Sequence, residues 1–152
     1  WGRPDMALFK FVKAITENKP IDVYNHGKMK RDFTFIDDLV VSVRKLIDAA
    51  PSNEINSQHQ EYNGDNISPV APFRVVNVGN SNPTLLTEFI AEIETALKTP
   101  AKLNFMPMQP GDVPATSANT DLLFALTDYK PNTSIKEGVQ KFGEWYLEYY
   151  KK

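Results

Sequence analysis

The residues best suited to bind an anion lie between Gly27 and Asp38, where a turn, three cations, an aromatic segment and a helix start follow one another. Arg31 is the strongest candidate, because a guanidinium presents a planar fork of donors that matches two phosphate oxygens. Lys28 and Lys30 would add positive charge without that geometry. The stretch predicts a phosphate-binding site, with a solvated basic turn as the alternative.

The composition limits both the size and the partners of the protein. The chain has 152 residues, 41% of them hydrophobic, which suits one ordinary core. Seventeen basic against 19 acidic residues give a net charge of -2, so we expect no nucleic-acid partner. There are no cysteines, and the two histidines, His26 and His59, have no metal-ligand spacing. We therefore expect no metal site.

The hydropathy and the first residues of the chain predict its cellular location and its relation to a longer protein. No apolar run approaches the roughly 20 residues needed to span a bilayer, and no secretion signal opens the sequence. We expect a cytoplasmic chain with no membrane contact. Because the sequence begins at Trp1 in what resembles the middle of a loop, we also expect a fragment of a longer protein.

Hydrophobic periodicity predicts a mixed α/β fold. Helices are expected at residues 5–18, after Asp38 through Ala50, from Leu86 to Leu97, at 119–126 and after Ser134. Strands are expected at residues 21–24, 31–36, 73–78 and 102–105. Asp5 is placed to cap its helix or to charge the first turn, and Asp37 or Asp38 can cap the next helix. Ser134 opens the last helix as part of a Ser-x-x-Glu capping box.

Two segments fit no regular element. Residues 51–72 are polar, contain three prolines and show no period, so we expect an exposed connection. Residues 106–114 hold three prolines and Gly111, and they predict a stiff loop that presents Asp112. A loop of this kind is usually placed for a purpose, although Asp112 could also simply close a turn.

Several blocks of sequence occur together in a recognisable order. They are residues 2–7 before a helix, 31–38 before another helix, 77–79, the Pro-Gly-Asp-Val block at 110–113, and the segment 129–146. As a set they resemble the C-terminal part of an NAD-dependent nucleotide-sugar epimerase of the extended short-chain dehydrogenase/reductase family. The resemblance is greatest to UDP-glucuronate 4-epimerases and covers nearly the whole chain.

The resemblance implies a division of labour within a longer parent protein. Residues 1–152 would be a small mixed α/β sugar-nucleotide-binding C-terminal domain, with the Rossmann core largely missing. NAD would be bound by the N-terminal Rossmann domain of the same parent, which would also carry the catalytic Tyr-x-x-x-Lys pair upstream of Trp1. No Gly-x-x-Gly-x-x-Gly phosphate loop occurs in the chain. We therefore expect no catalytic residue and no cofactor-binding residue here, and a parent that is a homodimer.

The resemblance also assigns the charged contacts to the substrate. Arg31 matches the arginine that contacts the diphosphate, and Asp112 matches the acid that accepts the ribose hydroxyls. Arg3 lies where glucuronate epimerases carry an arginine near the sugar carboxylate.

The remaining contacts are implied for the uracil and the phosphates. Asp22 and Tyr24 lie in the segment whose backbone reads the uracil edge, although Tyr24 could serve only strand packing. Met6 and Ala7 open a helix whose free amides and dipole favour an anion.

The expected function is binding of the UDP moiety during NAD-dependent epimerisation at C4, with UDP-glucuronate and UDP-galacturonate as the favoured pair. The fragment alone would be inactive. The alternatives are the substrate domain of a nucleotide-sugar 4,6-dehydratase or uronate decarboxylase, or a non-catalytic nucleotide-binding module. We also expect an exposed apolar face on residues 73–78 and the helix after Asp38, where the Rossmann domain would pack.

Overall fold

The computed structural model describes residues 3–51 and 64–152 and divides into two compact units. Unit 1 consists of residues 3–31, 83–116 and 134–152. Unit 2 consists of residues 32–51, 64–82 and 117–133. The chain passes from one unit to the other after Arg31, Asn82, Thr116 and Thr133. Each unit is therefore assembled from segments far apart in the sequence.

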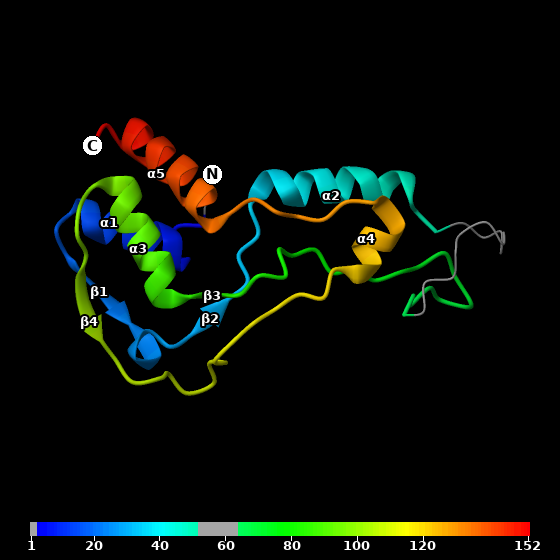
Figure 1. Cartoon of the computed structure of the whole chain (residues 1–152), viewed down its shortest axis with the longest axis horizontal. Coiled ribbons are helices and arrows are strands. Elements are labelled where there is room, and N and C mark those ends of the chain that lie inside the picture. The colour runs from blue at the N-terminus through cyan, green and yellow to red at the C-terminus, as the bar shows by residue number, and fades with distance from the viewer. Residues whose placement is uncertain (1–2, 52–63) are drawn as a thin grey trace. The chain divides into compact units, whose positions relative to one another are not determined.

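Unit 1 contains most of the regular structure, with three long helices beside two small sheets (Figure 1). Its elements are α1 (Ala7–Thr16), β1 (Pro20–Val23), the 3₁₀ turn η1 (Tyr24–Gly27), β2 (Lys30–Arg31), β3 (Thr84–Leu85), α3 (Leu86–Leu97), β4 (Lys102–Phe105) and α5 (Ile135–Tyr150). The helices expected near residues 5–18, 86–97 and after Ser134 are confirmed, as is the strand at 102–105.

The core of unit 1 lies between α1, α3 and α5. Val12, Phe89 and Ile93 are almost fully buried, and so are Val139 and Tyr146 of α5. These side chains follow the helical spacing of the sequence, so each helix turns one apolar stripe inward. Burial of such a set removes the unit's main apolar surface from water, which is the dominant favourable term in folding.

The strand expected at 21–24 forms, but it ends one residue early. β1 pairs in parallel with β4, and its residues Ile21 and Val23 are buried. Tyr24 instead begins η1, in which Asn25, His26 and Gly27 have φ values of 49°, 49° and 80°. A Cβ on Gly27 would lie 2.5 Å from the Thr87 methyl carbon, so only glycine fits this turn.

The strand expected at 31–36 is wrong beyond its first residue. β2 stops at Arg31, and Ile36 already belongs to a helix. The Asp32 carboxylate explains the stop, because it accepts the backbone N–H groups of Ser81 at 3.0 Å and Ala118 at 2.9 Å, which belong to loops. Asp32 thus ties three segments of unit 2 together instead of continuing a ladder.

Unit 2 is built from α2 (Ile36–Asp48) and the short α4 (Asp121–Thr127), which pack together. Asp38, 6% exposed, accepts hydrogen bonds from the Tyr129 hydroxyl at 2.7 Å and the Thr133 N–H at 2.9 Å. Burial works against the charge, but these hydrogen bonds prevail and lower the pKa of Asp38. Asp38 is therefore an internal tie of unit 2, not the helix cap expected from sequence.

Of the other predicted helix caps, two are wrong and one is confirmed. Phe35 and Met6 occupy the N-cap positions of α2 and α1 without a side-chain cap hydrogen bond, so the expected Asp37 and Asp5 caps are wrong. Ser134 does cap α5, because its Oγ accepts the Glu137 N–H at 3.2 Å.

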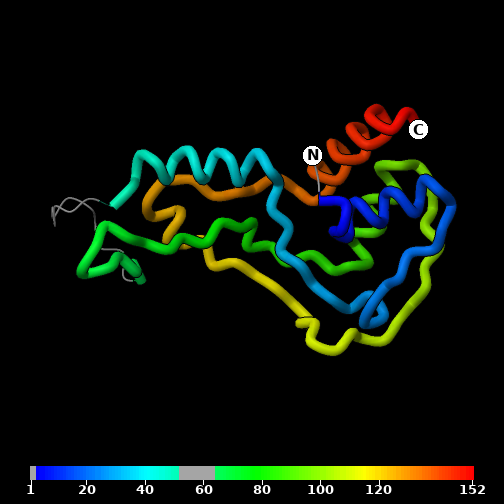
Figure 2. Tube along the Cα trace, turned by 180° about the vertical axis from the view of Figure 1, so that it is seen from behind, coloured from blue at the N-terminus to red at the C-terminus, as the bar shows by residue number. Residues whose placement is uncertain are grey.

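The outer face of α2 and the segment 73–78 are apolar and exposed, as expected. Val40 is 57% and Ile47 64% exposed on α2, while Phe73 is 59% and Val75 56% exposed. The strand expected at 73–78 is wrong, because no ladder forms along it among the described residues. In Figure 2 this segment lies in the green part of the tube. Residues 52–63 of the expected connection at 51–72 lie outside the described residues, and the described part, 64–72, is mostly exposed.

Candidate nucleotide-binding site

Arg31 lies on a strand that is held from both sides within unit 1. On one side β2 pairs antiparallel with β3, and Met29 accepts the Leu86 N–H at 2.8 Å. On the other side the Lys30 N–H donates to Pro114 at 2.9 Å, and Lys30 accepts the Thr116 N–H at 3.2 Å. This second neighbour was not expected from the sequence, because its residues carry no strand pattern. The backbone of Arg31 is fixed by these bonds.

The guanidinium of Arg31 meets the proline-rich loop. Nη2 donates to Asp112 Oδ1 at 2.7 Å, and Nη1 donates to the carbonyls of Val113 and Lys30, each at 2.9 Å. The two charged side chains are 29% and 32% exposed. The structure therefore brings together the two charged residues that the sequence assigned to one site, and both keep part of their surface in contact with solvent.

Asp112 also shapes its own loop. Its Oδ1 accepts the Val113 N–H at 2.9 Å, and its N–H donates to Gln109 at 3.2 Å. Gly111 just before it has a φ of 82°, which favours glycine even though no heavy atom lies within 4 Å of the place a Cβ would take. The carboxylate thus closes a turn and accepts a guanidinium through one oxygen.

The two residues expected to face the uracil lie at the end of β1. Asp22 is exposed and accepts a hydrogen bond from Asn104 Nδ2 at 2.7 Å. Tyr24 is half-buried where the strand turns into η1. Among the described residues, the hydrogen bonds and ion pairs of unit 1 link neither of them to Arg31 or Asp112.

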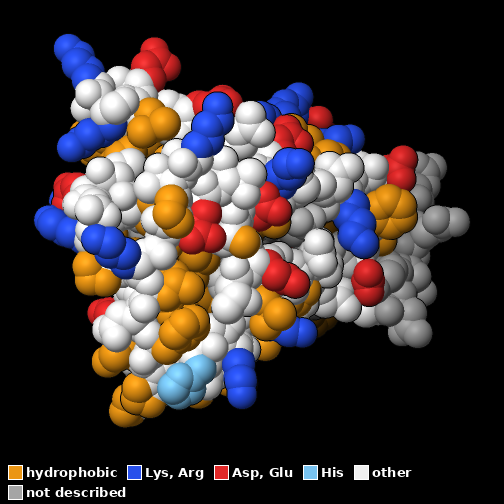
Figure 3. All heavy atoms as spheres, turned by 60° about the vertical axis from the view of Figure 1, so that its left-hand side comes forward, with side chains coloured by type: hydrophobic (Ala, Val, Ile, Leu, Met, Phe, Trp, Pro, Cys, Tyr) orange, Lys and Arg blue, Asp and Glu red, His pale blue; other side chains and the backbone are white. Residues whose placement is uncertain are grey.

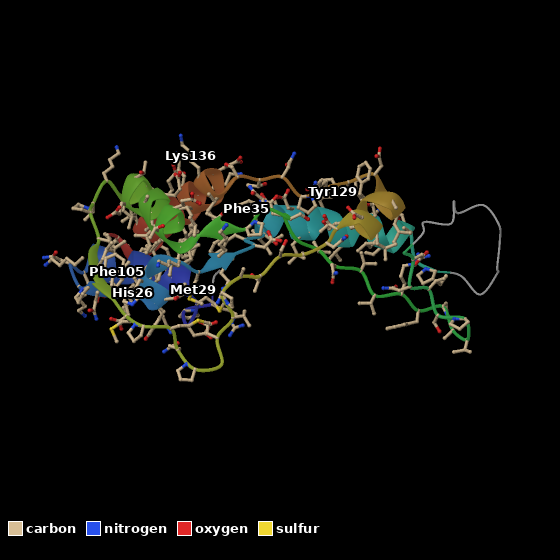
Figure 4. All side chains as sticks on the ribbon, turned by 60° about the horizontal axis from the view of Figure 1, so that its bottom comes forward. His26, Met29, Phe35, Phe105, Tyr129 and Lys136 are labelled. Atoms are coloured by element: carbon tan, nitrogen blue, oxygen red, sulfur yellow. The ribbon has the colours of Figure 1, made fainter. Side chains whose placement is uncertain are left out.

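An apolar surface surrounds this end of unit 1. The His26 N–H donates to the Met106 carbonyl at 3.1 Å, which joins η1 to the chain just after β4. Leu103 and Phe105 on β4 are 41% and 50% exposed. Figure 4 places His26 and Phe105 at the same end of the unit, and Figure 3 shows hydrophobic side chains gathered beside the histidine. Polar and apolar groups therefore meet at the end of β1.

The N-terminal candidates form a separate arrangement. Arg3 pairs with Asp5 through bonds of 2.6 and 3.2 Å, and their side chains are 73% and 60% exposed. Hydrogen bonding to Arg3 lowers the pKa of Asp5. Met6 is the N-cap and Ala7 the first residue of α1, so the first-turn amides have no partner within the helix.

Tyr24 and Lys28 have the Tyr-x-x-x-Lys spacing that the resemblance implies for a catalytic pair. Residues four apart face each other only on an α-helix, whereas η1 contains two left-handed residues, Asn25 and His26. The structure therefore does not stack these two side chains as a helical pair.

Three described glycines differ in the space around them. Gly27 is filled by Thr87, and a side chain on Gly79 would collide with Ala118. Gly111 lies in the proline-rich loop between β4 and α4, ten residues before the helix begins.

Over residues 3–51 and 64–152, no group of three or more acidic or histidine side chains could hold a metal ion. Within the same residues, no helix has the length and apolar character that crossing a membrane requires.

The family model for the NAD dependent epimerase/dehydratase family matches residues 2–93. The chain belongs to this family. It is 53% identical over 152 residues to a probable UDP-glucuronate 4-epimerase of Rhizobium meliloti, covering 100% of this chain and 44% of the relative. It is 52% identical over 155 residues to Protein CapI of Staphylococcus aureus, covering 100% of this chain and 45% of that protein. The chain spans less than half the length of these relatives.

Solved structures share the fold. A UDP-glucuronic acid 4-epimerase from Bacillus cereus, in complex with UDP-glucuronic acid and NAD, aligns with a TM-score of 0.75 at 25% sequence identity. The alignment covers 97% of this chain and 41% of that chain. The structure is thus a small mixed α/β part of an extended short-chain dehydrogenase/reductase fold, as the sequence predicted.

Proposed function

We propose that this chain binds the UDP moiety of a UDP-sugar within an NAD-dependent nucleotide-sugar 4-epimerase, with UDP-glucuronate as the preferred substrate. The observation that carries the proposal is the contact between Arg31 and Asp112, which gathers the diphosphate and ribose candidates into one partly exposed cluster. The similarity to the Rhizobium and Bacillus proteins supports the choice of substrate.

The chemistry of the proposed reaction explains why an anchor is needed. A 4-keto sugar that must present both faces to one hydride donor cannot be held firmly by its own ring. The enzyme must hold the parts that do not react, the diphosphate and the uridine. A guanidinium on a fixed strand suits this task, because its planar fork matches two phosphate oxygens.

The other contacts follow from the same pose. The Asp112 oxygen Oδ2, which accepts neither the Val113 N–H nor the Arg31 guanidinium in the bonds above, would accept a ribose hydroxyl. The backbone beside Asp22 and Tyr24 would meet the uracil, whose ring would find apolar surface near Phe105. The amides at Met6 and Ala7 would face the phosphates, and Arg3 would exchange Asp5 for the sugar carboxylate.

In the proposed parent enzyme, the part that lies outside this chain would carry out the redox chemistry. That portion would hold NAD, which supplies and takes back the hydride, and the catalytic acid–base pair. The apolar face of α2 and residues 73–78 would pack against it. The fragment alone would bind UDP weakly and catalyse nothing.

The test uses a chimera in which the unmatched portion of the Rhizobium relative precedes this chain. We expect the chimera to bind UDP and to interconvert UDP-glucuronate and UDP-galacturonate. Arg31→Ala should weaken UDP binding by about 10- to 150-fold, the equivalent of about 1.5–3 kcal/mol for charged hydrogen bonds. Arg31→Lys should restore only part of the loss, because an ammonium lacks the fork.

Lys28→Ala provides the matched control, since Lys28 is an exposed cation three residues away whose charge is expected to act only at long range. A folded chimera that binds UDP equally well with and without Arg31 would contradict the anchor. A different product, such as a 4-keto-6-deoxy sugar or a decarboxylated sugar, would instead support one of the alternative chemistries.

A further inference from the structure

The ion pair of Arg31 with Asp112 is less complete than that of Arg74 with Asp65. Arg74 donates from Nε to Asp65 Oδ1 at 2.8 Å and from Nη2 to Oδ2 at 2.7 Å, so one edge of its guanidinium satisfies both carboxylate oxygens. Arg31 reaches Asp112 only from Nη2 to Oδ1, at 2.7 Å. The first pair is closed on itself, whereas the second leaves donors and an acceptor unused.

The donors of Arg31 are only partly used. Nη1 donates to the carbonyls of Lys30 and Val113, and Nη2 donates to Asp112. Within residues 3–51 and 64–152, the Nε–H of Arg31 has no hydrogen-bond partner, and Nη2 keeps a second N–H. Nε and Nη2 are also the two atoms that Arg74 presents to its carboxylate. Arg31 therefore has an edge open for a bidentate anion, such as a phosphoryl group.

The Asp112 carboxylate places a negative charge beside this open edge. Its Oδ1 accepts Arg31 and the Val113 N–H, while Oδ2 has no partner in the described parts of the chain. Residues 106–116 contain no other ionisable side chain, and Gln109 is neutral. The charges of Arg31 and Asp112 cancel, so the pair attracts a bare anion less than a lone arginine would.

A bound phosphate would lie close to this carboxylate. Like charges at such short range oppose each other, and the effect persists here because the two side chains are only 29% and 32% exposed. The carboxylate cannot easily swing away, because the Lys30 N–H donates to Pro114 and the Thr116 N–H donates to Lys30. A ligand that also brings hydroxyl donors to Oδ2 would offset the repulsion, and a bare phosphate would not.

We infer that Asp112 is a specificity-determining residue, which excludes inorganic phosphate and pyrophosphate from Arg31 and admits a diphosphate that carries a ribose diol. The inference rests on the proposed function for the role of Arg31 as an anchor. It goes beyond that function because the carboxylate acts against some ligands as well as for one. Specificity of this kind comes from a repulsive group that only the correct ligand compensates.

Binding of UDP and of inorganic pyrophosphate to the chimera, measured by calorimetry, tests the inference. Asp112→Asn removes the charge and keeps an oxygen for the Val113 N–H. Pyrophosphate should then bind about 10-fold more tightly, whereas UDP should gain no more than about twofold, because it loses its charged hydroxyl acceptor. The preference for UDP over pyrophosphate should therefore fall by at least about fivefold, and a smaller fall would overturn the inference.

Two further variants separate charge from shape. Glu148→Gln removes the same charge from an exposed position on α5 and should change neither affinity by more than about 1.5-fold. Asp112→Glu keeps the charge, so its affinity for pyrophosphate should stay within about threefold of the unchanged chimera. Exchange of the Thr116 amide checks that the loop still lies beside β2. A Glu variant that binds pyrophosphate as tightly as the Asn variant would contradict the inference.

A ligand without the diol tests the other half of the inference. The compound 2′,3′-dideoxyuridine diphosphate carries the base and phosphates of UDP but offers nothing to Oδ2. The unchanged chimera should bind it at least about 10-fold more weakly than UDP, and Asp112→Asn should reduce this difference to about threefold or less. The same difference in both chimeras would mean that the carboxylate does not sense the diol, which would overturn the inference.

The outcomes also distinguish the inference from the proposed function. UDP binding that does not depend on Arg31 would refute the proposed anchor, whatever happens to pyrophosphate. UDP binding that depends on Arg31, with an unchanged preference in Asp112→Asn, would overturn the inference and leave the anchor intact.

Discussion

Units 1 and 2 use their apolar residues in opposite ways. Unit 1 buries Val12, Phe89 and Ile93 between three helices. In unit 2 the apolar side chains of α2 remain exposed, and burial among the described residues is confined largely to Leu122, Leu123 and the polar groups around Asp38. The same chain thus contains a unit with its own core and a unit held together mainly by hydrogen bonds. The comparison indicates that unit 1 can fold alone and that unit 2 needs a partner.

The difference also separates two roles. Arg31 and Asp112 belong to unit 1, so the proposed anchor is positioned by the unit that has a core. The exposed stripe of α2 and the exposed apolar residues of 73–78 belong to unit 2. Ligand contacts are placed most accurately on well-packed elements, whereas an apolar face left open is suited to docking.

The largest expected effect contrasts a core truncation with a surface truncation. Phe89→Ala should lower the free energy of unfolding of unit 1 by about 3–5 kcal/mol, because it removes a buried ring and leaves a cavity. Val40→Ala in unit 2 should change stability by less than about 0.5 kcal/mol, because that side chain is already 57% exposed. Urea unfolding measures both. Equal losses would mean that α2 has a core of its own.

A smaller effect is expected inside unit 2. Tyr129→Phe removes the hydroxyl that donates to buried Asp38, as Figure 4 helps to locate, and should destabilise unit 2 by about 1.5–3 kcal/mol. Asp37→Asn, at the exposed neighbouring position, serves as the control and should have little effect. Hydrogen exchange at Thr133 reports the change. If the Thr133 amide keeps its protection from exchange in the Tyr129→Phe variant, the hydrogen bond between Tyr129 and Asp38 is not what holds this segment.

The smallest expected effect is a pH dependence confined to unit 2. Burial and the Asp38 carboxylate raise the pKa of Tyr129 to about 12. Its contribution is therefore complete below the unfolded tyrosine pKa of about 10 and fades as the pH rises through 12. Asp38 has a lowered pKa, so its contribution is present above about 3.9 and is lost as the pH falls through the folded value. Titration of the Tyr129 ring by NMR measures its pKa in the folded chain. A pKa near 10 would refute the predicted rise.

The sequence predicted the helices of unit 1 well because local periodicity and packing agree there. Leu86 to Leu97 shows one apolar stripe, and that stripe is buried. The pairing of Arg31 with Asp112, 81 residues apart, was suggested only by the resemblance. The family and the small mixed α/β fold also followed from the sequence blocks.

The errors lie where long-range partners decide the outcome. Residues 32–35 have strand-like residues, but the Asp32 carboxylate meets loop amides that no local pattern reveals. Residues 73–78 have strand composition but find no ladder partner in the described chain. Asp38 carries a cap signal, yet its partners Tyr129 and Thr133 lie more than 90 residues away. A pattern within ten residues cannot specify such contacts.

A urea titration of the free chain, read residue by residue by NMR, tests the contrast between the units most directly. We predict two transitions, with α2 and α4 losing structure at low urea while the amides of α1, α3 and α5 remain folded to a distinctly higher midpoint. A single transition shared by all five helices would contradict the account, because it would show that unit 2 already has the cooperative core that its exposed side chains indicate it lacks.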